Sequence, residues 1–369
     1  MNFSPSFCQV DLAAVAANFR SLGDASLLMP VVKADAYGHG LLPVARKLAQ
    51  AGALRFAVGA ASEGVLLRQH GFSHDMVLLM GCHTPEEWFQ AVEHGLMPIV
   101  GSPEDIAAAQ TACGPSREMA VAIKCDSGMG RLGFAPDQAG AVIELLRGAS
   151  ALRPVLAVSH LACADMPEES TYTQEQVAAF DHFFTALAIA FPGVKRSLGN
   201  SAATLEKLPG DIGRPGLAIY GGDPFGSPSD HSLSWAMSVA APIIHVRQLR
   251  AGQSVSYGKI FTAHEDMRVA VVACGYATGV SRSLSGRMRM LVHGRRMRQI
   301  GRICMGMSML DITDAPEARP GDLAWILGGK AAPGEEAPTP WELANALDTI
   351  PYEILCQMGS MNKRVYIND

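Results

Sequence analysis

The sequence predicts an α/β protein with two regions of different pattern, and three observations support this prediction. From the N-terminus to about Gly222, short apolar strand-like runs alternate with helix-like runs. After residues 224–230, which are rich in turn-forming residues, the runs become short and strand-like. The chain also has 369 residues, more than the roughly 150 of a typical single domain. We therefore expect one domain over residues 1–230 and a second, mostly β, domain over residues 231–369.

The strand-like runs of the first region are mostly continuous rather than alternating, which is typical of parallel strands buried on both faces. Eight strand–helix units in about 220 residues are what a closed (β/α)₈ barrel requires. An open, doubly wound sheet fits the same alternation, so the pattern alone leaves the choice open. The expected strands are residues 6–11, 27–34, 55–58, 76–80, 96–100, 119–125, 154–160 and 195–199.

Local signals mark the helices between these strands. Thr84 is followed by Pro at the first helical position and by an acidic residue at the third, a capping-box pattern, and Ser102 begins a second such run. Residues 11–20 and 171–191 are also expected to be helical. In the second region we expect one helix near 339–347 and strands at 237–246, 267–273, 288–292, 297–300, 307–312 and 323–327.

Composition excludes several classes of function. Apolar residues make up 49% of the chain and charged residues 18%, which suits large buried cores. The formal net charge of −5 leaves no basic excess for a nucleic-acid partner. We find no apolar run that would cross a membrane and no secretory signal. The eight cysteines have no C-x-x-C or zinc-like spacing, so we expect free thiols in a reducing cytoplasm and no bound metal.

Two lysines terminate apolar strand-like runs, Lys33 after LMPVV and Lys124 after AVAI. A lysine at the carboxyl end of a barrel strand lies where such barrels have their active sites. Burial there would lower the pKa of the amine and favour covalent chemistry with a carbonyl. On spacing alone, however, a lysine whose stem packs while its head reaches solvent is the better interpretation of either residue.

The residues around Lys33 change that interpretation. The run VVKADAYGHG at 31–40 resembles the lysine signature of the alanine racemases, a family of enzymes dependent on pyridoxal phosphate (PLP). The resemblance extends over nearly the whole chain, through residues 124–133, 159–165, 200–203, 214–221, 255–258, 275–277 and 301–305. It implies a PLP-binding (β/α)₈ barrel followed by a β domain, in a head-to-tail homodimer with shared active sites. It also implies a cytoplasmic racemase that interconverts L-alanine and D-alanine, supplying D-alanine for peptidoglycan precursors.

The resemblance implies roles for the reacting residues. Lys33 would hold PLP covalently and act as one base, while Tyr257 of the other subunit would act as the second. Two bases suit racemisation, because a proton must leave one face of the reacting carbon and return to the other. Arg214 would face the pyridine nitrogen of PLP, supported by His160. Because an arginine cannot accept a proton, the ring would withdraw electrons less strongly than it does beside a carboxylate.

The remaining matches imply binding roles. Tyr37, Ser201 and the backbone N–H groups of Gly216 and Leu217 would bind the phosphate, and Asn200 belongs to the same cofactor-binding set. Arg131 would contact both the phenolic oxygen of PLP and the substrate carboxylate, which also receives the backbone N–H of Met305. Lys124 matches a lysine that is often carbamylated in the family, where the added negative charge would orient Arg131.

Alternatives and departures from the family remain. Gly128, Gly130 and Gly133 fit the G-x-G-x-x-G pattern of dinucleotide-binding enzymes, although no helix is expected until about Pro136. A non-enzymatic PLP-binding barrel would lack the β domain and Tyr257.

Four residues differ from those usual in the family: Gly306, Thr278, Ser360 and Cys163. These departures leave open a broader racemase that accepts serine or another short polar amino acid.

Overall fold

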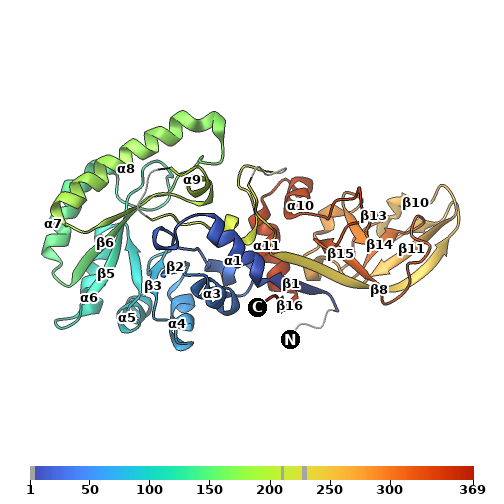
Figure 1. The fold of residues 1–369 in the computed structure, drawn as a ribbon, viewed down its shortest axis with the longest axis horizontal. Coiled ribbons are helices and arrows are strands. Elements are labelled where there is room, and N and C mark those ends of the chain that lie inside the picture. Colours follow the sequence, from blue (N-terminus) through green and yellow to red (C-terminus); the bar gives the residue numbers. More distant parts are fainter. Residues whose placement is uncertain (1–4, 209–211, 227–230) are drawn as a thin grey trace. The chain divides into compact units, whose positions relative to one another are not determined.

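The computed structural model describes residues 5–208, 212–226 and 231–369, and it divides into two compact units (Figure 1). One comprises residues 15–36 and 41–233, and the other comprises residues 1–14, 37–40 and 234–369. We call them the barrel unit and the β unit, after the sheets described next. Part of the expected linker, residues 227–230, lies outside the described residues, so the domain boundary at 230 stays a proposal.

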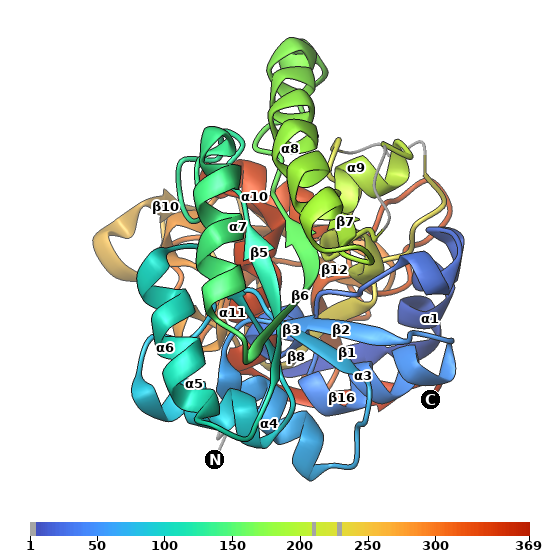
Figure 2. The same ribbon diagram turned by 90° about the vertical axis from the view of Figure 1, so that its left-hand side faces the viewer.

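The barrel unit contains six parallel strands that neighbour one another in chain order. Figure 2 shows helices on the outer side of these strands. The strands are β2 (Arg55–Val58), β3 (Asp75–Leu78), β4 (Met97–Val100), β5 (Met119–Lys124), β6 (Leu152–Val158) and β7 (Lys195–Ser197). The helices that follow them are α4 (Ala61–Gln69), α5 (Pro85–Glu93), α6 (Pro103–Cys113), α7 (Ala139–Gly148), α8 (Ser170–Ala190) and α9 (Ser201–Leu205).

Two further extended segments close this sheet into a ring. In the first segment, residues 28–32, the Val32 N–H donates to the Ala57 carbonyl of β2 (2.8 Å). On its other side the Met29 N–H donates to the Gly213 carbonyl (2.8 Å). The second segment, residues 212–215, reaches β7 through the Ile212 N–H and the Arg196 carbonyl (3.0 Å). Eight segments therefore form a closed barrel, and the predicted (β/α)₈ architecture is confirmed.

The predicted helix starts at Thr84 and Ser102 are confirmed. The Thr84 hydroxyl accepts a hydrogen bond from the Glu87 N–H (3.2 Å), and Ser102 forms a capping box with Asp105. Both caps satisfy N–H groups that the first turn of a helix leaves without intrahelical partners. Three other helices precede these along the chain, α1 (Leu12–Ser21), α2 (Lys33–Tyr37) and α3 (Leu41–Gln50).

The β unit is built on an eight-stranded sheet in which β8 pairs with both β15 and β11, so that six of the strands form a closed ring. Its core includes Leu249, Val269 and Ile300. The strands of the sheet are β1 (Phe7–Asp11), β8 (Met237–Leu249), β11 (Met267–Val272), β12 (Arg289–Val292), β13 (Arg295–Ile300), β14 (Ser308–Asp311), β15 (Leu323–Leu327) and β16 (Lys363–Ile367). The short strands β9 (Ser254–Val255) and β10 (Phe261–Thr262) pair with each other, and helices α10 (Pro340–Leu347) and α11 (Pro351–Met361) follow the sheet strands β11–β15.

Two expectations were wrong. The run at 6–11 is a strand, but it pairs with β8 and β16 in the β unit rather than in the barrel. Residues 212–215 take the place that it was expected to fill. The second region also contains two helices rather than one, because α11 follows α10 directly.

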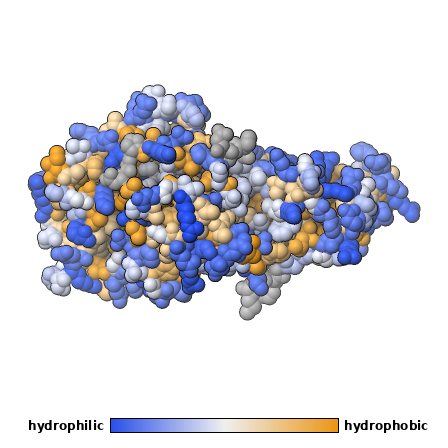
Figure 3. Space-filling model, viewed as in Figure 1, coloured by the Kyte–Doolittle hydropathy of each residue, from blue (hydrophilic) through white to orange (hydrophobic). Residues whose placement is uncertain are grey.

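Among the described residues, none of the helices combines the length and apolarity needed to cross a membrane. On the face drawn in Figure 3, hydrophilic and hydrophobic residues are interspersed.

Candidate active site

The predicted site residues of the barrel unit lie at the carboxyl ends of its parallel segments. Lys33 follows the first extended segment, and Lys124 is the last residue of β5. His160 lies two residues after the end of β6, and Arg214 is part of the closing segment. Because the carboxyl ends of parallel strands meet at one face of a barrel, the topology brings these side chains to the same face.

The backbone after Lys33 is unusual. Ala34, Asp35, Ala36 and Tyr37 all have φ values between 53° and 55°, so this turn is left-handed. Such a conformation costs about 1–2 kcal/mol for each residue with a side chain, or roughly 4–8 kcal/mol for the turn. The turn is closed by a hydrogen bond from the Ala36 N–H to the Val32 carbonyl (2.9 Å). It directs the chain sharply away from the strand immediately after Lys33.

The pKa values indicate which charged groups lie near one another. Burial lowers the pKa of His160 to about 3, and the positive charges of Arg214, Lys124, Arg131 and Lys33 contribute further. His160 is therefore neutral at physiological pH. Burial, followed by the charge of Arg214, likewise lowers the pKa of Lys124 to about 7. Because only 6% of the Lys124 surface is exposed, a large part of this lysine is uncharged at neutral pH.

Arg214 is held rigidly within the barrel unit. One terminal nitrogen donates to the Ser197 hydroxyl (2.6 Å), and the other donates to the carbonyls of Ser159 (2.5 Å) and Leu198 (3.3 Å). Burial lowers its pKa to about 10, so the guanidinium keeps its charge at neutral pH. None of these three hydrogen bonds uses the Nε–H group, which remains available as a donor.

Ser201 brings together the backbone that was predicted to bind phosphate. Its hydroxyl accepts hydrogen bonds from the N–H groups of Gly216 (2.9 Å) and Ala218 (3.2 Å), on either side of Leu217. Ser201 is the first residue of α9, and Asn200 caps that helix by accepting from the Ala203 N–H (3.1 Å). The Ser201 hydroxyl and the backbone of residues 216–218, which were predicted to bind phosphate, therefore lie side by side.

Three backbone amides of the glycine-rich loop after β5 bind Asp126. Burial alone would raise the pKa of Asp126, but hydrogen bonds from the N–H groups of Gly128, Gly130 and Arg131 lower it. These bonds, of 2.8 to 3.0 Å, occupy three amides of the loop, and the next helical residues begin only at Pro136, after the last glycine. The dinucleotide interpretation of this loop is therefore not supported. The same contacts fix the backbone of Arg131, whose side chain is exposed.

Three of the predicted residues belong to the β unit. Tyr257 is 69% exposed and lies in a tight turn between Ser256 and Gly258, which both have positive φ. Met305 is 63% exposed, and among the described residues its N–H makes no hydrogen bond. Tyr37 is buried, and its ring lies 5.7 Å from that of Tyr352. Burial, together with Tyr352 and Cys356, raises the pKa of the Tyr37 hydroxyl.

Comparison with known proteins identifies the family. Residues 10–224 match the model of the alanine racemase N-terminal domain, and residues 236–366 match that of the C-terminal domain. This chain belongs to the alanine racemase family. It is 44% identical over 365 residues to an alanine racemase of Nitratidesulfovibrio vulgaris (strain DSM 19637 / Miyazaki F), with 97% of each chain covered. It is 39% identical to an alanine racemase of Lawsonia intracellularis, again with 97% of each chain covered.

Solved structures of the family agree with this fold. The alanine racemase from D-cycloserine-producing Streptomyces lavendulae is 32% identical and superposes with a TM-score of 0.91, covering 99% of this chain and 98% of that one. The alanine racemase of Bacillus anthracis with bound L-Ala-P is 29% identical, with a TM-score of 0.88 and coverage of 100% and 96%. The resemblance to the alanine racemase family stated from the sequence is therefore confirmed.

Two acidic residues next to Lys33 were not predicted from the sequence to support the site. The Glu63 carboxylate accepts a hydrogen bond from the Asp35 N–H (3.2 Å), within the left-handed turn. The Asp35 carboxylate in turn accepts from the Leu41 N–H (2.6 Å) at the start of α3. Asp35 is part of the family signature, but nothing in its local pattern indicates this contact. Glu63 occupies the third position of α4, where an acidic residue is ordinary.

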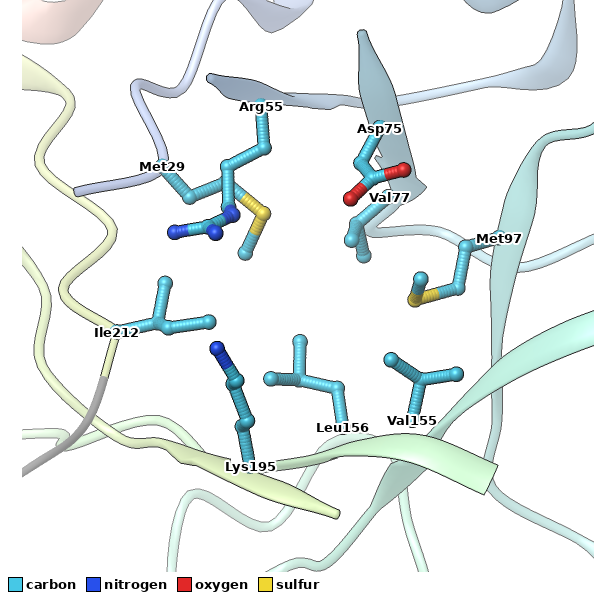
Figure 4. A pocket seen from close by; sticks show the side chains of 9 residues that line it. All are labelled: Met29, Arg55, Asp75, Val77, Met97, Val155, Leu156, Lys195 and Ile212. Carbon is cyan, nitrogen blue, oxygen red and sulfur yellow. The ribbon is translucent and has the colours of Figure 1, made fainter. Parts of the chain in front are cut away.

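A cavity of about 90 Å³ lies in the barrel unit at the amino ends of the strands, away from this site (Figure 4). Arg55, Asp75 and Lys195 are each the first residue of a strand, and their side chains point toward it. Arg55 donates to the Ser26 carbonyl (2.6 Å), a structural contact. Residues at this end of an α/β barrel generally serve stability, so we keep the active site at the carboxyl ends. The lining residues are Met29, Arg55, Asp75, Val77, Met97, Val155, Leu156, Lys195 and Ile212.

Proposed function

We propose that this protein is a PLP-dependent racemase that interconverts L-alanine and D-alanine, with Lys33 and Tyr257 as its two bases. The observation that carries the proposal is the cationic group at the carboxyl ends of the barrel. There Lys33 follows the strand, the buried Arg214 has an unused Nε–H, and neutral His160 lies near both. The names and the nearly full-length coverage of the curated relatives support alanine as the substrate.

The chemistry of these residues fits PLP. The Ser201 hydroxyl and the adjacent backbone of residues 216–218 suit a phosphate, and the positive charges of Lys33, Arg131 and Arg214 suit an anionic ligand. Both terminal nitrogens of Arg214 are already used, so its Nε–H would be the group that donates to the pyridine nitrogen. When bound, PLP withdraws electrons from the amino acid and so acidifies its α-hydrogen.

The proton transfers are the work of this chain's own side chains. The Lys33 amine takes or returns the α-proton on one face of the amino acid, and the Tyr257 phenol does so on the other. Arg131 holds the substrate carboxylate, and the free N–H of Met305 gives it a second donor. Because the pKa of Lys124 is lowered to about 7, a substantial fraction of its amine is neutral near pH 7 and able to react with carbon dioxide, releasing a proton to solvent, and the resulting carbamate would orient Arg131.

We further propose a homodimer in which Tyr257 and Met305 complete the active site of a second copy. Tyr257 and Met305 are more than half exposed, and Ile260, Tyr276 and Met307 of the same unit are between 41% and 46% exposed. The Tyr276 N–H donates to the Cys304 carbonyl (3.1 Å), which links two of the loops that carry them. Exposed aromatic and methionine side chains of this kind are enriched at protein interfaces. None of the eight cysteines, all of which lie among the described residues, forms a disulfide, which supports a cytoplasmic location.

The test is reductive labelling of the purified protein with PLP and borohydride, followed by peptide mass spectrometry and a chiral assay of alanine. We expect a yellow protein, a single label on Lys33, and conversion of either alanine enantiomer to the racemate. A label on another lysine would overturn the assignment of Lys33. A correctly labelled protein that leaves both enantiomers unchanged would overturn the racemase proposal.

A further inference from the structure

Glu63 connects two backbone segments that lie on either side of Lys33. One carboxylate oxygen, Oε2, accepts a hydrogen bond from the Gly59 N–H just after β2 (2.7 Å). The other, Oε1, accepts from the Asp35 N–H in the left-handed turn (3.2 Å). Gly59 itself lies against Lys33, because a Cβ built on Gly59 would be 3.4 Å from the Lys33 Cβ and 3.1 Å from Glu63 Oε2.

The chain offers an internal comparison for this contact. Three successive barrel helices have an acid at their third position, Glu63 in α4, Glu87 in α5 and Asp105 in α6. Each accepts a hydrogen bond from the loop that precedes its own helix. Glu87 accepts from the His83 N–H (2.7 Å), and Asp105 accepts from the N–H groups of Gly101 and Ser102.

Only the hydrogen bonds of Glu63 extend beyond its own strand–helix unit. Glu87 accepts the hydrogen bond from its loop through Oε2 alone, and Asp105 accepts both of its loop hydrogen bonds through Oδ2 alone. Glu63 uses both oxygens, and the second one binds the turn after Lys33. Helix capping alone therefore accounts for the contacts of Glu87 and Asp105, but it does not account for the Asp35 contact of Glu63.

We propose that Glu63 is a positioning residue for Lys33. It joins the left-handed turn to the loop after β2 and thereby fixes the direction in which the Lys33 side chain leaves the backbone. This inference rests on the proposed function of Lys33 as the residue that holds PLP. It assigns Glu63 no contact with the substrate or the cofactor.

Replacement of Glu63 by Gln isolates the second contact. Glu63 accepts from Gly59 and from Asp35 at two different oxygens, and a glutamine replaces one of these oxygens by a nitrogen that only donates, so one of the two positions loses its acceptor. Glu87→Gln is the matched control, because the single acceptor of Gln is enough for His83. Thermal unfolding of both variants shows whether either one is generally destabilised.

Two measurements test the proposal. The first is deuterium uptake by the peptide that contains residues 33–41, in protein without PLP; we expect Glu63→Gln to speed it about tenfold and Glu87→Gln to leave it unchanged. The second is the rate at which added PLP is captured on Lys33, trapped with borohydride; we expect Glu63→Gln to be about tenfold slower and Glu87→Gln to match the wild type.

The outcomes separate this inference from the proposed function. Unchanged uptake in Glu63→Gln would overturn the inference, and so would faster uptake with a normal capture rate. A wild-type protein that captures PLP elsewhere than on Lys33 would instead overturn the proposed function. In that case the uptake measurement still decides whether Glu63 fixes the turn, because it involves no PLP.

Discussion

Lys124 should make the free energy of unfolding depend on pH, and the substitution Lys124→Met should remove this dependence. Burial and the charge of Arg214 lower the pKa of this lysine from 10.5 to about 7. At about 1.4 kcal/mol for each pH unit, the difference corresponds to roughly 5 kcal/mol. Between pH 7 and pH 10.5 the unfolded chain keeps a proton that the folded chain lacks. The free energy of unfolding therefore rises with pH across this window, and below pH 7 the full penalty of the buried charge applies.

Lys124→Met removes the titrating group while keeping most of the apolar stem. Between pH 7 and pH 9.5 we expect the free energy of unfolding of the wild type to rise by about 3 kcal/mol relative to that of this variant. The measurement is urea unfolding at several pH values, in buffers free of carbon dioxide so that Lys124 remains an amine. Lys195→Met is the control for the loss of a lysine as such, because Lys195 also lies at a strand end but is exposed.

Parallel curves for the wild type and Lys124→Met would refute this reasoning. They would mean that Lys124 keeps its charge in the folded state through contact with a group of opposite charge. A difference that appears only when carbon dioxide is admitted would mean that the carbamate, rather than the neutral amine, determines the stability.

Three further predictions concern the site. Tyr257→Phe should retain PLP and lose racemisation by about 10²–10⁴-fold, and α-proton exchange measured from each enantiomer should become strongly unequal, since only Lys33 still acts; equal residual exchange would contradict the two-base assignment. Arg214→Glu would let the pyridine nitrogen stay protonated, so a new long-wavelength absorbance band should form when alanine is added; an unchanged spectrum would place Arg214 elsewhere. Ser360 lies exposed in the last turn of α11, and Ser360→Tyr should shift the ratio of alanine to serine activity toward alanine if this residue borders the substrate entrance; an unchanged ratio would remove the main support for a broader substrate range.

The positions of most barrel strands and helices could be predicted from the local sequence, but the pairing of the strands could not. Apolar runs and helix caps identified β2 to β7 and the starts of α5 and α6. The run at 6–11 has the same apolar character as a barrel strand, but its partner β16 lies more than 350 residues later. Residues 212–215 include Gly213 and Pro215, which weaken a strand pattern, and only the neighbouring segments hold them extended. Pro351 at the first position of α11 is a local signal from which the start of this second helix could have been predicted.

Prediction of the candidate site depended on specific motifs rather than on general patterns. The run from Lys33 to Gly40 carried the family resemblance, and the topology then accounts for the common location of Lys124, His160 and Arg214. Arg214 donates hydrogen bonds to the backbone carbonyls of Ser159 and Leu198. Every residue type has such a carbonyl, so these contacts could not be predicted from the identity of the residues. Glu63 was overlooked for the opposite reason, because its identity already had a sufficient local explanation as a helix cap.

The left-handed turn after Lys33 shows why local sequence cannot specify the position of this lysine. The turn costs roughly 4–8 kcal/mol, which is comparable to the 5–15 kcal/mol of net stability of a typical protein. Ala34 and Ala36 have no preference for such a backbone, and asparagine or glycine would adopt it more readily. The conformation therefore persists only because the folded barrel unit stabilises it, through the burial of Ala36 and the contacts of Asp35 with Glu63 and Leu41. The geometry of Lys33 is thus a property of the assembled barrel, and mutations that loosen this turn should impair PLP capture before they unfold the protein.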